Sequence, residues 1–263
     1  MSAILPGLCS VTFREQTTDE VIDLAAEAGI VGIEWGADVH VQPGDLDTAR
    51  TVAERSAAAG VACPSYGTYL GARSPITDRV DVEAACRTAE SLGATNLRVW
   101  AQLGVQPDVD ETDRAEVTSG IAVAAEVAAD HGLTVGVEFH HGTLTETADS
   151  AIRLLTAIGA PNLFSYWQPN FWTEDPHDID GQIAEMRAVR PHLSHLHTFW
   201  WLAKGERQPL IDGAAMWSAV LADAETTVNS WTEDRYAFME FVADDDPEQF
   251  RRDAATLLGW LAG

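Results

Sequence analysis

The chain has 263 residues and a mass of 28.4 kDa, which suits one α/β domain, and no apolar run is long enough to predict a membrane span. Its 41 acidic and 16 basic residues give a net charge of −25, which argues against nucleic acid or an anionic membrane as a partner. The three cysteines, Cys9, Cys63 and Cys86, lack CxxC spacing, and the N-terminus lacks the basic region of a secretory signal. We therefore expect a cytoplasmic protein with reduced thiols.

A short apolar segment followed by a longer amphipathic one recurs along the whole chain. We expect strands over residues 7–14, 31–35, 61–66, 96–101, 133–142, 163–168, 193–199 and 236–242. We expect a helix after each of them, over residues 18–28, 46–59, 82–92, 116–131, 146–158, 179–189, 214–224 and 247–261. Many of these helices end at a glycine, as is typical of helix C-caps.

Eight alternating strand–helix pairs predict an α/β fold, a single-domain (β/α)₈ TIM barrel over residues 1–263. An open doubly wound sheet is the alternative, although such a sheet seldom needs eight even units. No GxGxxG motif follows the first strand and no GxxxxGK[ST] motif occurs, so a nucleotide-phosphate loop is not expected. In a TIM barrel the active site lies at the C-terminal ends of the strands.

The fifth expected strand, LTVGVEFHHG, places polar side chains at such an end. Because side chains alternate along a strand, Glu138 and His140 share the face opposite the valines. A buried carboxylate is costly without a partner, so Glu138 is half of an ion pair, or it is a ligand or a catalyst. The ion-pair alternative depends on arginine, and apart from Arg14 only Arg98 lies within an expected strand.

Three later strands end in similar residue types. The sixth leads into Gln168, the seventh contains His195 and His197 on one face, and the eighth brings Glu240. Carboxylate, amide and imidazole donors together suit Mn²⁺, Mg²⁺, Co²⁺ or Zn²⁺. His197 is nearer the end of its strand and is the favoured ligand, whereas His195 is expected one layer deeper.

This ordered set resembles the xylose-isomerase-like barrels, the sugar isomerases and epimerases that include ketose 3-epimerases and hydroxypyruvate isomerases. The resemblance covers the whole chain and includes the loop RQPLIDGAAMW after the seventh strand. It implies one divalent metal ion held by Glu138, His197 and Glu240, with the two glutamates also acting as acid and base. Where the family has an aspartate ligand this chain has YWQPN, so Gln168 is the nearest oxygen donor.

The resemblance implies a reaction beside a carbonyl group, in which the metal ion and two glutamates form and quench an enediolate. Isomerisation and epimerisation are both compatible with the sequence. A keto-inositol dehydratase on the same barrel is an alternative, and so is a sugar-binding barrel altered by the glutamine at position 168. An apurinic endonuclease with three zinc ions is disfavoured by the net charge.

The substrate is expected to be a small sugar or polyol, and a homodimer or homotetramer is possible. Aromatic side chains stack on sugar rings, and polar ones bind their oxygens. The expected substrate-binding residues lie at strand ends or in the adjoining loops: Tyr66, Trp100, His140, Trp167, Asn170, His195, Trp200, Lys204 and Arg207.

Overall fold

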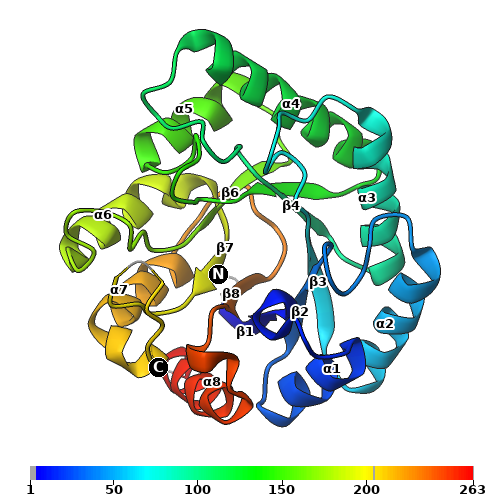
Figure 1. Cartoon of the computed structure of the whole chain (residues 1–263), viewed down its shortest axis with the longest axis vertical. Coiled ribbons are helices and arrows are strands. Elements are labelled where there is room, and N and C mark those ends of the chain that lie inside the picture. Colours follow the sequence, from blue (N-terminus) through cyan, green and yellow to red (C-terminus); the bar gives the residue numbers. More distant parts are fainter. Residues whose placement is uncertain (1–3, 204, 263) are drawn as a thin grey trace.

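The computed structural model describes residues 4–203 and 205–262. Within these ranges, eight parallel strands form a closed barrel in chain order, with β8 paired to β1 (Figure 1). Their bounds are Ile4–Cys9 (β1), Gly32–Gly36 (β2), Ala62–Gly67 (β3), Asn96–Val99 (β4), Thr134–Val137 (β5), Leu163–Trp167 (β6), Leu193–Thr198 (β7) and Arg235–Met239 (β8). The predicted TIM barrel is confirmed.

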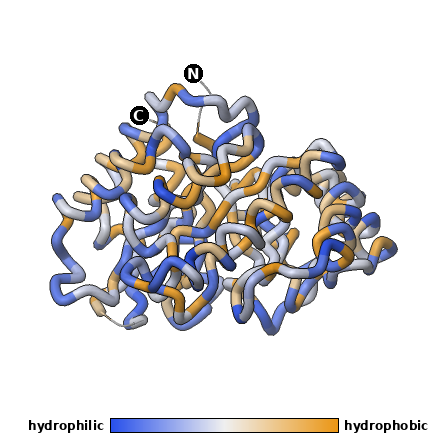
Figure 2. Tube along the Cα trace, turned by 90° about the horizontal axis from the view of Figure 1, so that it is seen from above, coloured by the Kyte–Doolittle hydropathy of each residue, from blue (hydrophilic) through white to orange (hydrophobic). Residues whose placement is uncertain are grey.

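The helices form a ring around the barrel (Figure 1). They are Thr18–Glu27 (α1), Leu46–Ala58 (α2), Arg79–Leu92 (α3), Glu111–Asp130 (α4), Ala148–Ile158 (α5), Ile179–Val189 (α6), Ala214–Glu225 (α7) and Pro247–Leu261 (α8). Hydrophobic segments run through the middle of the molecule, and hydrophilic ones lie mostly at its outer edge (Figure 2). Among the described residues, no helix has the length and apolarity that a membrane crossing requires.

Side-chain caps determine where several helices begin. Thr17 caps α1 in a capping box with Glu20, and Asp78 and Asp110 accept hydrogen bonds from the first backbone amides of α3 and α4. The latter two caps start their helices earlier than the apolar pattern alone predicted, at Arg79 and Glu111. A polar first turn carries no hydrophobic periodicity, so the pattern located the buried part of each helix and missed its start.

Glycines on the inner face of the barrel make room for aromatic rings. A Cβ atom at Gly7, Gly32 or Gly136 would come within 2.3 Å of the ring of Phe238, Tyr236 or Tyr166, respectively. These rings therefore fill the lower part of the barrel, and the polar groups of the inner face gather above them, near the C-terminal ends of the strands.

The first strand is shorter than predicted, and the difference affects the site. β1 ends at Cys9, and residues Ser10–Phe13 form a 3₁₀ turn rather than more strand. The Ser10 hydroxyl accepts a hydrogen bond from the backbone amide of Gly36 at 2.8 Å and contacts His40 Nδ1 at 2.9 Å. These contacts anchor the turn to the end of β2, although Val11 and Thr12 favour strand by propensity. Cys9 thus stands at the C-terminal end of β1.

Candidate active site at the barrel mouth

A cavity of about 340 Å³ opens at the C-terminal ends of the strands. Five of the predicted site residues line it, namely Trp100, Glu138, His140, Arg207 and Glu240. Arg14, Tyr69 and Arg98 line it as well, and Phe241 lies at its edge beside Glu240. The cavity thus combines two of the predicted acidic groups with arginines and aromatic rings.

Glu138 forms an ion pair with Arg98 on β4. The Arg98 guanidinium pairs with Glu138 Oε2 through Nη1, and its Nε lies 2.9 Å from Oε1 of Glu34 on β2. All three side chains are at most 3% exposed. One buried cation therefore bridges two buried carboxylates, and a neighbouring cation favours the charged form of a carboxylate. The ion-pair alternative for Glu138 is realised.

Glu34 is the most heavily hydrogen-bonded carboxylate of the site. Its Oε2 accepts hydrogen bonds from Tyr166 Oη at 2.6 Å and from Ser65 Oγ at 2.8 Å, and the Cys9 thiol donates to its Oε1 at 3.7 Å. Burial alone would raise the pKa of Glu34, but Arg98 and the hydrogen bonds from His197 and Tyr166 outweigh burial and hold that pKa well below its usual range. Glu34 is a permanent anion in this site.

The two ring nitrogens of His197 face different partners. Nε2 lies 3.3 Å from Glu34 Oε1, whereas Nδ1 lies 3.0 Å from Gln168 Oε1 and 3.4 Å from Glu240 Oε2. In the tautomer that donates Nε2–H to Glu34, the Nδ1 lone pair points toward two more oxygen atoms. Three converging acceptors require a proton or a cation between them.

Glu240 contrasts with Glu34 in its surroundings. It is 6% exposed, and its Oε2 makes no hydrogen bond within the part of the chain that the structure describes. Burial raises the pKa of Glu240, and the charge of Glu34 adds to the rise, while His197 and Arg98 oppose it. No arginine is paired with Glu240 among the described residues.

These donors fit a divalent cation. A histidine that ligates a metal ion usually donates its other ring N–H to a carboxylate. Here Glu34 is that carboxylate, and the second ring nitrogen of His197 faces additional oxygens. Glu240 Oε2, which has no hydrogen bond to a described residue, and Gln168 Oε1 add two oxygen donors to the nitrogen donor of His197. Three of the four predicted ligands thus come together. The fourth, Glu138, is paired with Arg98 and does not belong to the close group of possible ligand side chains found among the described residues.

Sequence reasoning missed Glu34 altogether and saw Arg98 only as a possible partner of Glu138. A glutamate in the apolar strand GIEWG was the available signal, because it is a buried acid at a strand end like Glu138. Gly67 is part of the same arrangement. A Cβ atom at Gly67 would lie 2.7 Å from Arg98 Nη2 and 3.0 Å from Glu34 Oε1, so only glycine leaves space for this ion pair.

Several predicted substrate-binding residues do not line the cavity: Tyr66, Trp167, Asn170, His195 and Trp200. Strand alternation accounts for two of them, since Ser65 and Gln168 face the barrel interior and their neighbours Tyr66 and Trp167 therefore face the helices. Trp167 packs edge-on against Trp217 of α7. Lys204 lies outside the described residues.

The other three are held in place by structural contacts. His195 sits a layer below His197, as expected, where its Nδ1 accepts a hydrogen bond from the backbone amide of Tyr236. Burial lowers the pKa of His195 to about 3, so the ring is neutral. Asn170 Oδ1 accepts a hydrogen bond from the backbone amide of Trp172, and Trp200 packs edge-on against Phe171. Asn170 and Trp200 thus support loops around the mouth, whereas His195 packs in the barrel below it.

Aromatic rings cover one side of the cavity. Tyr69 stacks on Trp100 at a centroid distance of 5.8 Å, and Trp100 contacts the His140 ring at 4.7 Å. Burial lowers the pKa of His140 to about 4, so this ring is neutral at physiological pH. A neutral aromatic wall beside carboxylates is suited to the C–H faces and hydroxyl groups of a small polyhydroxy molecule.

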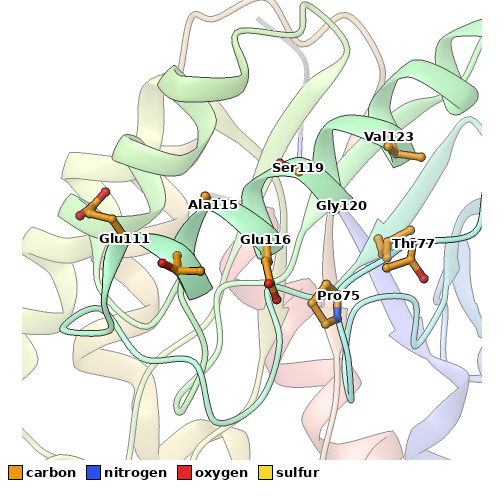
Figure 3. Close-up of a pocket in the computed structure, with 10 residues that line it drawn as sticks. Pro75, Thr77, Glu111, Ala115, Glu116, Ser119, Gly120 and Val123 are labelled. Carbon is orange, nitrogen blue, oxygen red and sulfur yellow. The ribbon is translucent and has the colours of Figure 1, made fainter.

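A hollow larger than this cavity lies elsewhere. A groove of about 800 Å³ runs between the loop at Pro75–Thr77 and one face of α4 (Figure 3). Its titratable residues are Glu111 and Glu116, which come from α4 alone, and Glu111 is paired with Arg153 on the surface. Without convergent polar groups this groove offers no chemistry, and the smaller cavity at the strand ends is the candidate active site.

Comparisons with known proteins agree with the fold. The chain is 26% identical to a 3-dehydroshikimate dehydratase of Bacillus anthracis over 202 residues, which is 73% of this chain and 70% of the relative. The crystal structure of the probable 3-DHS dehydratase AsbF from the same organism matches with a TM-score of 0.78 at 17% identity, covering 97% of this chain and 99% of that one.

Two epimerase structures are similar to a comparable degree. An L-ribulose 3-epimerase gives a TM-score of 0.73 at 17% identity, over 99% of this chain and 94% of that one. A D-psicose 3-epimerase gives a TM-score of 0.71 at 17% identity, over 98% of both chains. At these identities the structural likeness shows the fold alone. The family model described as xylose isomerase-like TIM barrel matches residues 22–221, and the chain belongs to that family.

Proposed function

We propose that the protein is an isomerase or epimerase of a small sugar or related hydroxy-ketone, working by proton transfer between Glu138 and Glu240. The observation that carries the proposal is that both glutamates line one cavity in opposite settings. Glu138 is paired with the Arg98 cation, whereas Glu240 Oε2 has no hydrogen-bond donor among the described residues. Two carboxyl groups in contrasting environments are suited to the roles of base and acid.

In the forward direction Glu138, kept anionic by Arg98, accepts the proton from the carbon beside the substrate carbonyl. Glu240 then delivers a proton to the enediolate, at the same carbon from the other face in an epimerase or at the neighbouring carbon in an isomerase. In the reverse direction the two glutamates exchange roles. Arg98 acts through Glu138 and is a positioning residue in this scheme.

A divalent metal ion is part of the proposal. When bound, such an ion polarises the carbonyl group and stabilises the negative charge of the enediolate. His197, Gln168 and Glu240 would hold it. Glu34 fixes the tautomer of His197 that presents Nδ1 to the ion.

The cavity limits the substrate to a small molecule. A volume of about 340 Å³ is at the lower end for ligand pockets and accommodates a monosaccharide or a compound of similar size. Tyr69, Trp100 and His140 would cover its C–H face, and Arg207 lies at the rim near Asp245, its ion-pair partner. The cytoplasmic location and the homo-oligomeric state stay predictions from sequence.

A dehydratase is the second candidate, favoured by the similarity to a 3-dehydroshikimate dehydratase. The same two glutamates would serve such a reaction. Glu138 would take the proton beside the carbonyl, the C–O bond at the next carbon would break, and Glu240 would protonate the departing hydroxyl to release water. The two candidates share the first step and differ in the fate of the enediolate.

Solvent exchange separates the candidates. The enzyme would be incubated in D₂O with Mn²⁺ or Zn²⁺ and a panel of three- to six-carbon ketoses, a keto-inositol and 3-dehydroshikimate, and NMR would follow the products. Deuterium in a product with the carbon skeleton and hydroxyls intact supports the isomerase or epimerase. Loss of water supports the dehydratase. Binding without exchange would favour a sugar-binding barrel, and no change with any compound would refute the proposal for this panel.

A further inference from the structure

Cys9 stands at the end of β1, directly beside the converging acceptors. Its side chain is 1% exposed, and its thiol donates a hydrogen bond to Glu34 Oε1 at 3.7 Å. The Cys9 Sγ, a ring nitrogen of His197 and a carboxylate oxygen of Glu240 all lie within 4.8 Å of one another. Within residues 4–203 and 205–262 this is the one group of three histidine, cysteine or acidic side chains so close together that a metal ion could bridge them.

The surroundings of the thiol point to a ligand independently of the cysteine itself. Glu240 is 6% exposed, and its Oε2 lacks a hydrogen bond to any described residue while lying 3.4 Å from His197 Nδ1. In the tautomer of His197 that donates Nε2–H to Glu34, a buried carboxylate oxygen, an imidazole lone pair and an amide oxygen thus converge without a shared donor among the described residues. A thiol contributes one weak donor and cannot satisfy three acceptors.

We infer that Cys9 is a sulfur ligand of the divalent ion, completing a set with His197, Glu240 and Gln168. The inference rests on the metal-assisted function proposed above and deepens it. On binding, the Cys9 S–H bond breaks, a sulfur–metal bond forms, and the proton leaves with the buffer. The negative charge of the thiolate then offsets part of the charge of the divalent cation.

A sulfur ligand narrows the predicted choice of metal. Thiolates favour Zn²⁺ and Co²⁺, whereas Mg²⁺ prefers oxygen ligands alone. Glu138, paired with Arg98, is then left free to act as the base at the opposite wall of the cavity. The ligand set and the base become two separate groups of side chains.

Cys63 supplies a matched control. It is a second buried cysteine on a strand, β3, where its sulfur accepts a hydrogen bond from Trp35 Nε1 at 3.3 Å. It belongs to no cluster of possible ligands among the described residues. A serine in its place keeps an acceptor for Trp35, so Cys63→Ser tests the loss of a buried thiol without touching the proposed site.

The experiment is a titration of the metal-free protein with Co²⁺, followed by optical spectroscopy. A sulfur-to-cobalt charge-transfer band in the near ultraviolet is expected for the wild-type protein and for Cys63→Ser, and the band should be absent in Cys9→Ser. The affinity for Zn²⁺, measured by competition with a chelator, should fall about tenfold or more in Cys9→Ser. X-ray absorption of the wild-type zinc protein should show one sulfur at about 2.3 Å.

The outcomes separate this inference from the proposed function. Tight Co²⁺ binding without the band, zinc without a sulfur neighbour, or a band that persists in Cys9→Ser would overturn the cysteine ligand and leave the metal-assisted function standing. Failure of the wild-type protein to bind either ion would overturn both. The wild-type spectra decide the point even if Cys9→Ser does not fold.

Discussion

The two sides of the barrel mouth hold similar side chains in opposite electrostatic states. On the β2–β4–β5 side, the Arg98 cation bridges Glu34 and Glu138, so the charges are paired. On the β7–β8–β1 side, His197, Glu240 and Cys9 lie together without an arginine among their described partners. A glutamate at a strand end therefore has no fixed role. Its role depends on whether an arginine from a neighbouring strand pairs with it. Arg98 on β4 pairs with Glu34 and Glu138 and not with Glu240.

The largest expected effect comes from removing the cation of the paired side. Arg98→Met keeps the side-chain volume roughly constant and leaves Glu34 and Glu138 buried without their partner. We expect the free energy of unfolding to fall by about 3–5 kcal/mol in chemical denaturation. Arg55→Met is the control, because its pairs with Asp19 and Asp23 are on the surface and should cost at most about 1 kcal/mol. Equal losses in both variants would contradict the division of the mouth into two sides.

The second prediction concerns the unpaired side. Glu240→Gln keeps the shape of the side chain but cannot transfer a proton as a carboxylic acid. We expect turnover of the substrate found in the exchange panel to fall by a factor of about 10² or more, while the fold is retained. The exposed Glu54→Gln on α2 serves as the control. Near-normal turnover of Glu240→Gln, with circular dichroism unchanged, would remove Glu240 from the reaction.

A smaller effect is expected from closing the space beside Arg98. In Gly67→Ala the new Cβ atom would come within 2.7 Å of Arg98 Nη2, so the guanidinium must shift away from its two carboxylates. We expect a loss of about 1–3 kcal/mol in the free energy of unfolding, as for other overpacked sites. Gly259→Ala in α8 has no atom within 4 Å of the added methyl and should be neutral or stabilising. Thermal unfolding of the two variants side by side makes the measurement.

The two sides also differ in how far the sequence could predict them. The barrel was predictable because eight apolar segments alternate with amphipathic ones, and His197 and Glu240 were found because they stand at the ends of such segments. Glu138 was found in the same way, but its partner could not be chosen, because pairing across a barrel depends on strand register. Arg98 lies opposite Gly136 on β5, and Gly67 on β3 leaves the space between them and Glu34.

Two aromatic residues were wrongly expected to line the mouth, because sequence position near a strand end does not determine which face of the strand a side chain occupies. Tyr66 and Trp167 were expected at the mouth because they lie at strand ends, yet each is one residue out of phase with the inward-facing neighbours Ser65 and Gln168. A shift of one residue along a strand exchanges the barrel interior for the helix layer. Cys9 was expected only to be a reduced thiol, because the predicted first strand ran through Arg14 and concealed the strand end at Cys9.

The last prediction adds charge to the unpaired side. In Gln168→Glu a carboxylate of the same reach replaces the amide near His197 Nδ1, so the acceptors gain a negative charge that a divalent ion would neutralise. We expect Zn²⁺ affinity to rise by about tenfold, as measured against a chelator, since ligand charge strengthens the binding of a cation. The metal-free variant should be less stable than the wild type, because it buries one more carboxylate without a partner.

The control for charge alone is Asn170→Asp. The side chain of Asn170 accepts a hydrogen bond from the backbone amide of Trp172 and does not line the cavity. If both variants changed zinc affinity equally, the effect would come from the overall field of the protein and not from coordination. A rise confined to Gln168→Glu would place the ion among His197, Glu240 and position 168, on the side of the mouth that Arg98 does not reach.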